Sequence, residues 1–238
     1  MHALHKVLQA FFSPSSARLS LPDVWAGFQL NLKMMFLAAA LVLVIALAIA
    51  IVRGLPGRGA APLRALAVVY TDLFRGTPII LVAFLVGFGL PGLQLHVIST
   101  QSNYVYGVIA LTLVYTAYVT EVYRAGIESV HPSQRMAARS LGLSYFQALR
   151  YVVVPQAVRR VIPPLLNDFV GLQKDTALVT VIGVAEVTYQ AQAFSNKYYN
   201  FTSYVVAAVF FVFLTVPLAR FTDHLIAIRE RRERAQML

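Results

Sequence analysis

An uncharged apolar run from Met34 to Val52 is the feature that most constrains what this chain can fold into. A helix needs about 20 mostly apolar residues to cross the hydrocarbon core of a bilayer, so the run predicts a membrane-spanning helix that stops at Arg53. Charged residues make up only 13% of the 238 residues, whereas soluble domains carry about 25%. The sequence therefore predicts an integral membrane protein whose spanning elements are helices.

Four more segments have the length and apolar character of spanning helices, which predicts about five crossings in one membrane domain that covers residues 1–238. The fourth segment is interrupted by polar residues, and Pro163-Pro164 is expected to break the chain where it enters the membrane. A more polar stretch, residues 124–160, is predicted to be a loop between the third and fourth spans. We expect the spans at residues 28–52, 72–95, 104–123, 161–189 and 203–222.

The distribution of arginines predicts the orientation of the chain. Arginines concentrate in residues 53–64, 124–160 and 220–234, and the formal net charge is +10. Because Lys and Arg accumulate in cytoplasmic loops, five crossings place the N-terminus outside and the C-terminus in the cytoplasm. Nucleic-acid binding is not expected, since the arginines are not collected on one amphipathic helix.

The loop at residues 124–160 carries its own helix signals. His131-Pro132-Ser133 opens a short helix that Ser133 is expected to cap, and Gly142 is expected to end it. A capping-box pattern that begins at Ser144 starts a second helix, which Pro155 should disturb. From the residues alone, this helix pair either packs on its own membrane bundle or is held by a partner.

The same loop resembles the EAA signature of the permease subunits of bacterial binding-protein-dependent ABC importers. Met136-Ala137-Ala138, Gly142 and Val152–Pro155 stand at the family's spacing, with Met136 where the family has Glu. The likeness covers most of the chain, from about residue 27 to residue 229. Motifs elsewhere resemble the branch for polar amino acids of the histidine, glutamine, arginine or glutamate type, and they are Phe74–Pro78, Tyr118–Ile127, Pro163–Asn167 and Lys174–Thr176.

The resemblance implies an all-α, polytopic membrane bundle of about five transmembrane helices with a cytoplasmic coupling helix. It implies the transmembrane subunit of an importer for polar amino acids, which forms the translocation path in the bacterial cytoplasmic (inner) membrane. The implied partners are a dimer of ABC ATPase subunits, a second permease subunit, an extracytoplasmic substrate-binding protein, membrane lipid and the substrate amino acid.

The chain is not expected to be an enzyme or to bind a cofactor. A phosphate-binding loop needs G-x-x-x-x-G-K-[ST], and none of the four lysines follows a glycine, so ATP is expected to be used by the partner subunit. The five histidines are scattered without a metal-ligand pattern, so no metal site is predicted.

The resemblance also assigns residues to the coupling helix. Arg135 and Arg139 are four residues apart on one face, where they face either an acidic groove of the ATPase or lipid headgroups. The residues expected to contact the ATPase are Ser133, Gln134, Arg135, Met136, Ala137, Ala138, Arg139, Ser140, Leu141 and Gly142.

Polar residues at membrane depth are expensive, and they tend to face a cavity or pair with one another. Asn167, Asp168 and Glu121 are therefore predicted to line the substrate path. The alternative for the polar residues of this region is a structural network of Lys174 with Asp175 and of Arg with Asp at the cytoplasmic interface. The residues that carry the family's structural motifs are Pro155, Arg75, Lys174 and Asp175.

An ion-gradient-driven secondary amino acid transporter is the alternative function. It predicts repeated halves with broken helices at corresponding positions, and only one span is clearly interrupted in this sequence. A membrane enzyme is disfavoured because no nucleophile–base set stands at membrane depth.

Overall fold

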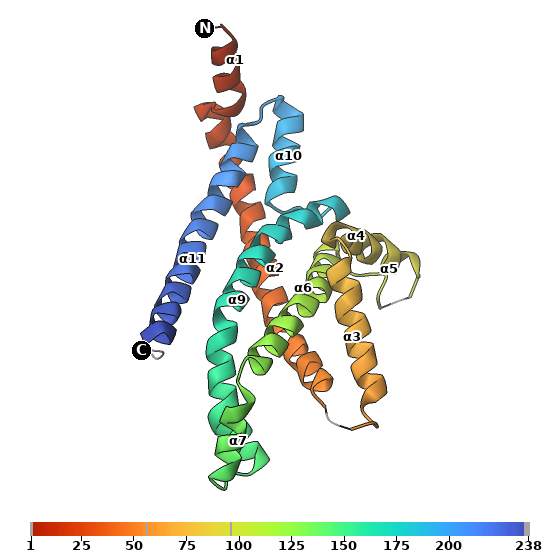
Figure 1. The fold of residues 1–238 in the computed structure, drawn as a ribbon. Coiled ribbons are helices and arrows are strands. Elements are labelled where there is room, and N and C mark those ends of the chain that lie inside the picture. The colour runs from red at the N-terminus through yellow and green to blue at the C-terminus, as the bar shows by residue number, and fades with distance from the viewer. Residues whose placement is uncertain (1, 56, 96, 236–238) are drawn as a thin grey trace. The chain divides into compact units, whose positions relative to one another are not determined.

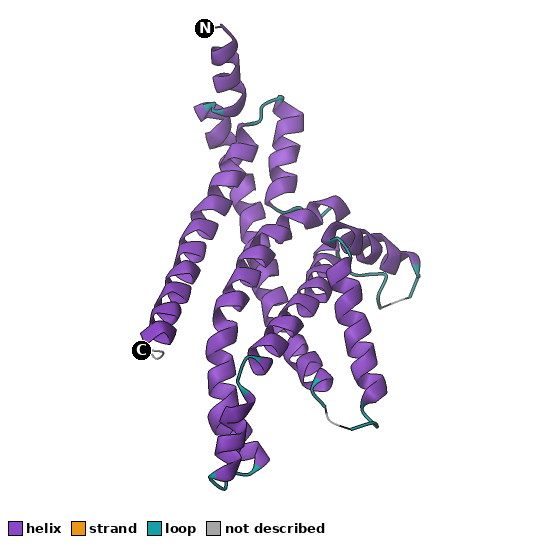
Figure 2. Ribbon diagram, viewed as in Figure 1, coloured by secondary structure: helices purple, strands orange, loops and turns teal. Residues whose placement is uncertain are grey.

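The computed structural model describes residues 2–55, 57–95 and 97–235. Every regular element in these residues is helical and none is a strand, which confirms the predicted all-α class (Figure 2). In chain order, the elements of Figure 1 are α1 (His2–Phe11), α2 (Pro14–Arg53), α3 (Ala61–Gly76), α4 (Ile79–Phe84), the π-helix η1 (Leu85–Gly89), α5 (Leu90–Gly92), α6 (Asn103–Glu128), α7 (Pro132–Ser140), α8 (Tyr145–Ala148), the π-helix η2 (Leu149–Val153), α9 (Val154–Asp175), the 3₁₀-helix η3 (Thr176–Ile182), α10 (Val187–Tyr198) and α11 (Thr202–Ala235).

The described residues form two compact units. Unit 1 contains those within residues 1–40, 77–112 and 170–220, and unit 2 contains those within residues 41–76, 113–169 and 221–238. Each of the long helices α2, α6, α9 and α11 contributes one segment to each unit.

Among the described residues, three helical stretches are long and apolar enough to cross a membrane alone, namely Ala3–Arg53, Asn103–Glu128 and Thr202–Ile228. Ala61–Gly76 and Ile79–Gly92 pass the same test only as a bent pair. The predicted span at 161–189 is not in this set, because polar residues such as Asn167, Asp168 and Lys174 lower the mean hydropathy of its helix. The count of five spans stays a prediction.

The segment predicted as a span at residues 72–95 is not one helix. The chain is helical from Ala61, breaks after Gly76, resumes at Ile79 and bends by 106° at the break. Pro78 has φ −56° and ψ 133°, which is not helical, and it caps α4. A proline disfavours helical geometry at the residue before it, so Thr77-Pro78 ends α3 although the surrounding residues are apolar.

The segment predicted as a span at residues 161–189 also differs. Pro163 and Pro164 lie inside α9 without breaking it, so the predicted break there is wrong. Proline is tolerated in membrane helices because neighbouring groups satisfy the freed carbonyls, and the wide π turn of η2 precedes Pro155. The helix instead gives way to η3 after Asp175, and Gly183 turns the chain with φ +79°.

Unit 1 has an apolar core where α10 packs beside the first part of α2 and the start of α11 (Figure 1). Val24 and Phe28 from α2 meet Val187 and Ala191 from α10 in this core. The helices approach closely because α2 carries Gly27, where an added Cβ would lie 2.7 Å from the backbone nitrogen of Val187.

A buried polar hub lies beside this core. The side chain of Asn31 donates to Thr176 Oγ1 and to Glu186 Oε2, both at 3.0 Å, and it accepts from the backbone N–H of Val187 at 3.0 Å. Glu186 is 0% exposed and caps α10 by accepting from the backbone N–H groups of residues 188 and 189, each at 3.0 Å. The hub ties α2 to η3 and to the start of α10.

Unit 2 combines the end of α2 with α3, the second part of α6 and the helices from α7 to α9. Tyr70 Oη donates to the carbonyl of Leu113 at 2.7 Å, which joins α3 to α6. An added Cβ at Gly126 would lie 2.1 Å from Val161 Cγ1, so α6 and α9 pack too closely for any larger residue there. A small core of Val130, Val153 and Ala157 supports the loop that carries α7.

Candidate functional site: an exposed capped helix and a charged cavity

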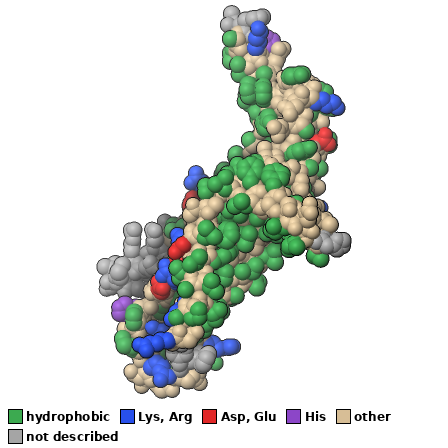
Figure 3. Space-filling view, turned by 90° about the vertical axis from the view of Figure 1, so that its right-hand side faces the viewer, with side chains coloured by type: hydrophobic (Ala, Val, Ile, Leu, Met, Phe, Trp, Pro, Cys, Tyr) green, Lys and Arg blue, Asp and Glu red, His purple; other side chains and the backbone are tan. Residues whose placement is uncertain are grey.

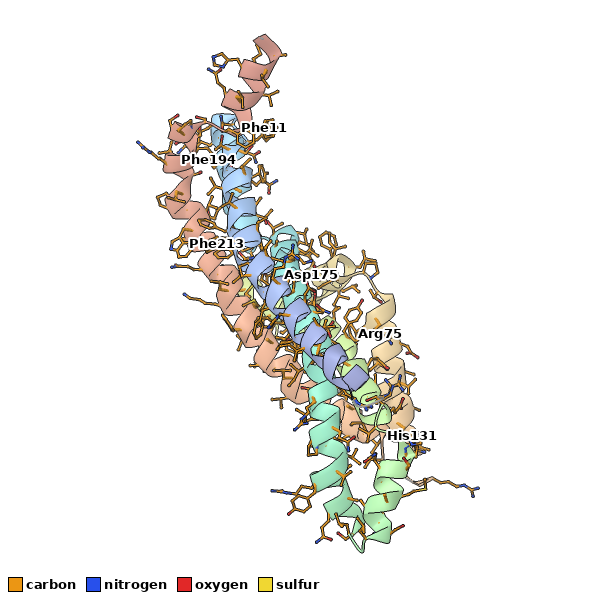
Figure 4. All side chains as sticks on the ribbon, turned by 60° about the vertical axis from the view of Figure 1, so that its left-hand side comes forward. Phe11, Arg75, His131, Asp175, Phe194 and Phe213 are labelled. Atoms are coloured by element: carbon orange, nitrogen blue, oxygen red, sulfur yellow. The ribbon has the colours of Figure 1, made fainter. Side chains whose placement is uncertain are left out.

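The short helix α7 begins at a histidine cap. His131 Nδ1 accepts from the backbone N–H of Ser133 at 3.2 Å, and Pro132 occupies the first turn, where a missing N–H costs nothing. The prediction that Ser133 caps this helix is wrong. The N–H of Ser133 is the group that is capped, and the hydroxyl of Ser133 lies 2.7 Å from the same ring nitrogen of His131. His131 is labelled in Figure 4.

The end of α7 is closed by a Schellman motif, which confirms the predicted role of Gly142. Gly142 has φ +87°, a conformation that glycine adopts without strain. Its N–H donates to the carbonyl of Arg139 at 3.0 Å, and the N–H of Leu143 donates to that of Ala138 at 3.2 Å. The next helix starts at once, because Ser144 and Gln147 form the predicted capping box, with reciprocal bonds of 2.8 and 3.3 Å.

Most of the predicted contact residues of α7 and its end are exposed. Met136 is 61% exposed and Leu141 is 82% exposed, so two large apolar side chains face outward from a polar loop. Arg135 and Arg139 are exposed too, and Figure 3 shows basic side chains gathered at the end of unit 2 that carries α7. Ala138 is the exception, because at 5% exposure its side chain is not presented to a partner.

A second feature of unit 2 is a cluster of charges around Glu121. Its carboxylate accepts from Arg53 at the end of α2 and from Arg124 Nε at 2.8 Å, while Arg75 Nη1 on α3 lies 4.0 Å from it. Arg53 also donates to Thr71 Oγ1 at 3.1 Å. One acid therefore joins three helices, α2, α3 and α6.

Beside this cluster lies a cavity of about 390 Å³ within unit 2. Its charged residues are two acids, Glu121 and Asp168, and two arginines, Arg75 and Arg160. Asp168 Oδ2 is buried and has no hydrogen-bond partner among the described residues. The full lining is Arg75, Tyr118, Glu121, Val122, Ala125, Gly126, Ser129, Arg160, Pro164 and Asp168.

The structure thus brings together two of the three residues predicted for the substrate path. Glu121 and Asp168 line one cavity, whereas Asn167 is exposed and is not part of its lining. Arg75, predicted only as a structural motif, joins them. Pro155 lies in the first turn of α9, and Lys174 and Asp175 end that helix in unit 1, outside the cavity.

Sequence reasoning missed several residues of these sites. Arg53 was read as the end of a span, although an arginine there can also reach an acid on a neighbouring helix. Arg160 donates to the carbonyl of Ser129, which fixes it at the cavity wall. The described residues contain no group of three or more His, Cys, Asp or Glu side chains that could hold a metal ion.

With the capped helix and the cavity described, the relatives of the chain decide its family. Residues 55–233 match the family described as "Binding-protein-dependent transport system inner membrane component". The chain belongs to this family. The match includes α7, the charged cluster apart from Arg53, and the whole of the cavity lining.

Individual members of the family are similar over most of the chain. It is 38% identical over 159 residues to the probable glutamine ABC transporter permease protein GlnM of Bacillus subtilis (strain 168), covering 66% of this chain and 72% of that one. It is 31% identical over 201 residues to the arginine transport system permease protein ArtQ of the same organism, covering 84% and 89%.

Solved structures show the same fold. A chain from the "Crystal structure of an amino acid ABC transporter with histidines" superposes with a TM-score of 0.78 at 33% identity, covering 89% of this chain and 94% of that one. A chain of the MetNI methionine ABC transporter has a TM-score of 0.68 at 16% identity, which shows the fold alone. The predicted permease fold is confirmed, and none of these matches favours an ion-gradient-driven transporter.

Proposed function

We propose that this chain is the transmembrane subunit of an ABC importer for polar amino acids. Its family supports the membrane role, and the relatives named for glutamine and arginine support the substrate class. The observation that carries the proposal is α7, a helix that is capped at both ends. Most of its side chains are exposed, including Met136, and so is Leu141 directly after it. A helix built in this way suits contact with a separate motor protein.

The coupling helix acts through its rigidity. His131 fixes the first turn and Gly142 closes the last, so a force on α7 moves the helix as one body instead of unwinding it. Met136 and Leu141 supply exposed apolar anchors of the kind that fill pockets at protein interfaces. With Met136 in place of the family's Glu, the contact with the ATPase relies on apolar packing and on the charge of Arg135.

The cavity of unit 2 is proposed to lie on the substrate path. An amino acid presents an ammonium group that needs acceptors and a carboxylate that needs donors. Asp168 supplies a free buried acceptor, and Arg75 and Arg160 supply donors on the same lining. Glu121 pairs with Arg53 and Arg124 and lies 4.0 Å from Arg75, so its carboxylate is already engaged and it positions these arginines rather than contacting the substrate first.

The partners follow from the family. We infer a dimer of ABC ATPase subunits that binds and hydrolyses ATP, a second permease subunit and an extracytoplasmic binding protein that delivers the substrate. The location is the bacterial inner membrane, with the N-terminus outside and the C-terminus in the cytoplasm. A reporter fused to the C-terminus should read as cytoplasmic, and an external signal would contradict this orientation.

Uptake into proteoliposomes tests the function. The chain is reconstituted with its ATPase and binding protein, and the uptake of labelled glutamine, arginine, histidine and glutamate is measured with and without ATP. We expect uptake of at least one of them only when ATP and the ATPase are both present. Uptake that an ion gradient drives without the ATPase would instead establish the secondary transporter.

Cross-linking tests the coupling contact separately. The sequence has no cysteine, so Met136→Cys or Leu141→Cys introduces a single thiol on α7. Either should cross-link to the ATPase in the assembled transporter. Tyr199→Cys is the matched control, because Tyr199 is 89% exposed but lies in unit 1 at the end of α10. Equal yields at the α7 sites and at residue 199 would contradict the assignment.

A further inference from the structure

Unit 1 contains an apolar groove that no part of the proposed transport mechanism uses. Its volume is about 300 Å³, and it lies where the α1–α2 corner meets the start of α11. Its walls are almost entirely apolar and include Phe11, Phe12, Ala17, Leu21, Val209 and Phe210. An open apolar groove of this kind needs an occupant that is apolar itself.

The groove has a fixed shape because α1 is fastened to the chain at its rim. The carbonyl of Ala10 accepts from the N–H of Phe201 at 2.8 Å, and the carbonyl of Gln9 accepts from Asn200 Nδ2 at 2.9 Å. The rings of Phe11 and Phe201 stack with their centroids 5.2 Å apart. These contacts satisfy two carbonyls near the end of α1 and hold the helix against the start of α11.

The fastened helix is amphipathic and its apolar face is uncovered. Leu4, Val7, Leu8 and Phe11 recur at the spacing of one helical face and are 65%, 50%, 48% and 40% exposed. The opposite face carries polar residues such as Lys6, and α1 contains neither Asp nor Glu. A basic amphipathic helix of this kind lies in the interface of a bilayer, with its apolar face toward the acyl chains.

The groove also continues into a surface that faces lipid. Val209, Val212, Phe213 and Val216 follow the i, i+3, i+4, i+7 pattern of one side of α11 and are 58%, 58%, 80% and 49% exposed. Figure 4 labels Phe213 within this stripe. Because α11 is long and apolar enough to cross a membrane, we expect this row of side chains to border the acyl chains of the lipid. Val209 belongs both to this row and to the wall of the groove, so the groove opens onto the same surface.

Charge at the rim selects the headgroup. Arg18 is exposed and follows Pro14, a residue of the groove wall, by four positions, so it shares that side of α2. Asp23 follows Pro14 by nine positions and therefore lies on the opposite side of the helix. We propose that the groove binds one acyl chain of an anionic phospholipid, whose phosphate Arg18 contacts at the rim.

The chain carries its own probe for this site. Trp25 is the only tryptophan in the sequence, and its ring lies 5.3 Å from that of Phe210 in the groove wall. The purified full-length chain is reconstituted in phosphatidylcholine vesicles that contain a small, equal mole fraction of dibrominated phosphatidylglycerol or dibrominated phosphatidylcholine. Bromine quenches tryptophan at short range, so we expect the brominated phosphatidylglycerol to quench Trp25 several-fold more strongly.

Two variants separate the headgroup from the acyl chain. Arg18→Gln should bring the quenching by the two lipids close to equality, whereas Ala17→Phe should fill the groove and reduce the quenching by both. Lys33→Gln is the matched control, since Lys33 is an exposed cation on α2 that is not part of the groove wall. It should leave the preference unchanged.

Two results would overturn the proposal. The first is equal quenching by both lipids in the unaltered chain with no effect of Arg18→Gln, which would mean that only bulk lipid touches the groove. The second comes from Val209→Cys in the assembled transporter, where it is the only thiol of this chain. A disulfide between two copies at this position would show that a second permease, and not a lipid, covers the groove.

Discussion

The buried acids of the two units are handled in opposite ways. Glu186 in unit 1 is fully buried, and its carboxylate accepts from two backbone N–H groups and from Asn31. Asp168 in unit 2 lines a cavity and has a buried oxygen without a hydrogen-bond partner. Glu121 lines the same cavity, and its carboxylate is paired with Arg53. Both units therefore place acids at depth, but among the carboxylates of the described residues it is Asp168, in unit 2, that has a buried oxygen without a hydrogen-bond partner.

This difference in hydrogen bonding suggests different roles for Glu186 and Asp168. A carboxylate whose two oxygens both accept hydrogen bonds from fixed donors stabilises the fold, and it has little left to offer a ligand. An unsatisfied buried oxygen costs stability, and a chain retains it where a ligand or an ion completes it. The hub around Glu186 therefore serves the fold, whereas we propose that Asp168 binds a ligand and that Glu121 holds the cavity wall together.

The largest effect is expected from Glu121→Ala, which leaves Arg53 and Arg124 without their shared counter-charge. Breaking a largely buried ion pair by removing one partner costs about 3 kcal/mol, and the side chains of Glu121 and Arg53 are only 15% and 14% exposed. Thermal unfolding of the purified chain should show a clearly lowered Tm. Glu128→Ala is the control, because Glu128 is 62% exposed and should change stability by less than about 1 kcal/mol.

The hub in unit 1 should respond to Asn31→Ala with a loss of about 2 kcal/mol, because the N–H of Val187 and the oxygens of Glu186 and Thr176 lose a partner. Thermal unfolding again measures the loss. Asn167→Ala, at an exposed position, should stay within about 0.5 kcal/mol. If Asn31→Ala lowered uptake per folded molecule while leaving the Tm intact, the hub would belong to the transport path and the comparison would fail.

Asp168→Asn should show the reverse pattern. It keeps the shape of the side chain and removes the charge, so we expect the Tm to change little while the affinity for substrate falls about tenfold, which corresponds to about 1.4 kcal/mol. Concentration-dependent uptake measures the change. Unaltered uptake at every substrate concentration would remove Asp168 from the path and leave the cavity without a role in binding.

The smallest of these four effects is expected at the end of α7. Gly142→Ala places a Cβ in a left-handed conformation and costs about 1 kcal/mol, whereas Gly142→Asn is better tolerated there. Each variant is assayed for uptake per ATP hydrolysed in the assembled transporter. We expect alanine to lower this ratio more than asparagine does. Equal ratios in both variants would mean that the closed end of α7 does not matter for coupling.

Local signals allowed much of α7 and its surroundings to be predicted. Gly142 and the Ser144–Gln147 pair act on backbone groups within a few residues, so the sequence contains the whole interaction. His131 was misjudged because an imidazole nitrogen can replace the serine hydroxyl as the cap. Asp168 and Glu121 were found because charges stand out against an apolar background.

The missed features depend on residues far apart in the chain. Asn31 and Glu186 are separated by 155 positions, and neither follows a local pattern that points to the other. The ion pair of Arg53 with Glu121 likewise joins segments 68 positions apart. The break at Thr77-Pro78 was visible in the sequence but was outweighed by apolar residues on both sides, because average hydropathy carries no information about a missing N–H.

The bend between α3 and α4 has a consequence for water. A helix that stops at Gly76 ends its own hydrogen-bond ladder there, so the last carbonyls of α3 find their partners outside the helix. Within a bilayer, such acceptors are tolerated only where protein encloses them or water reaches them, and lipid can do neither. Arg75 stands on this last turn and also lines the charged cavity. We therefore expect water to reach the break between α3 and α4, which would shorten the apolar distance that a polar solute has to cross.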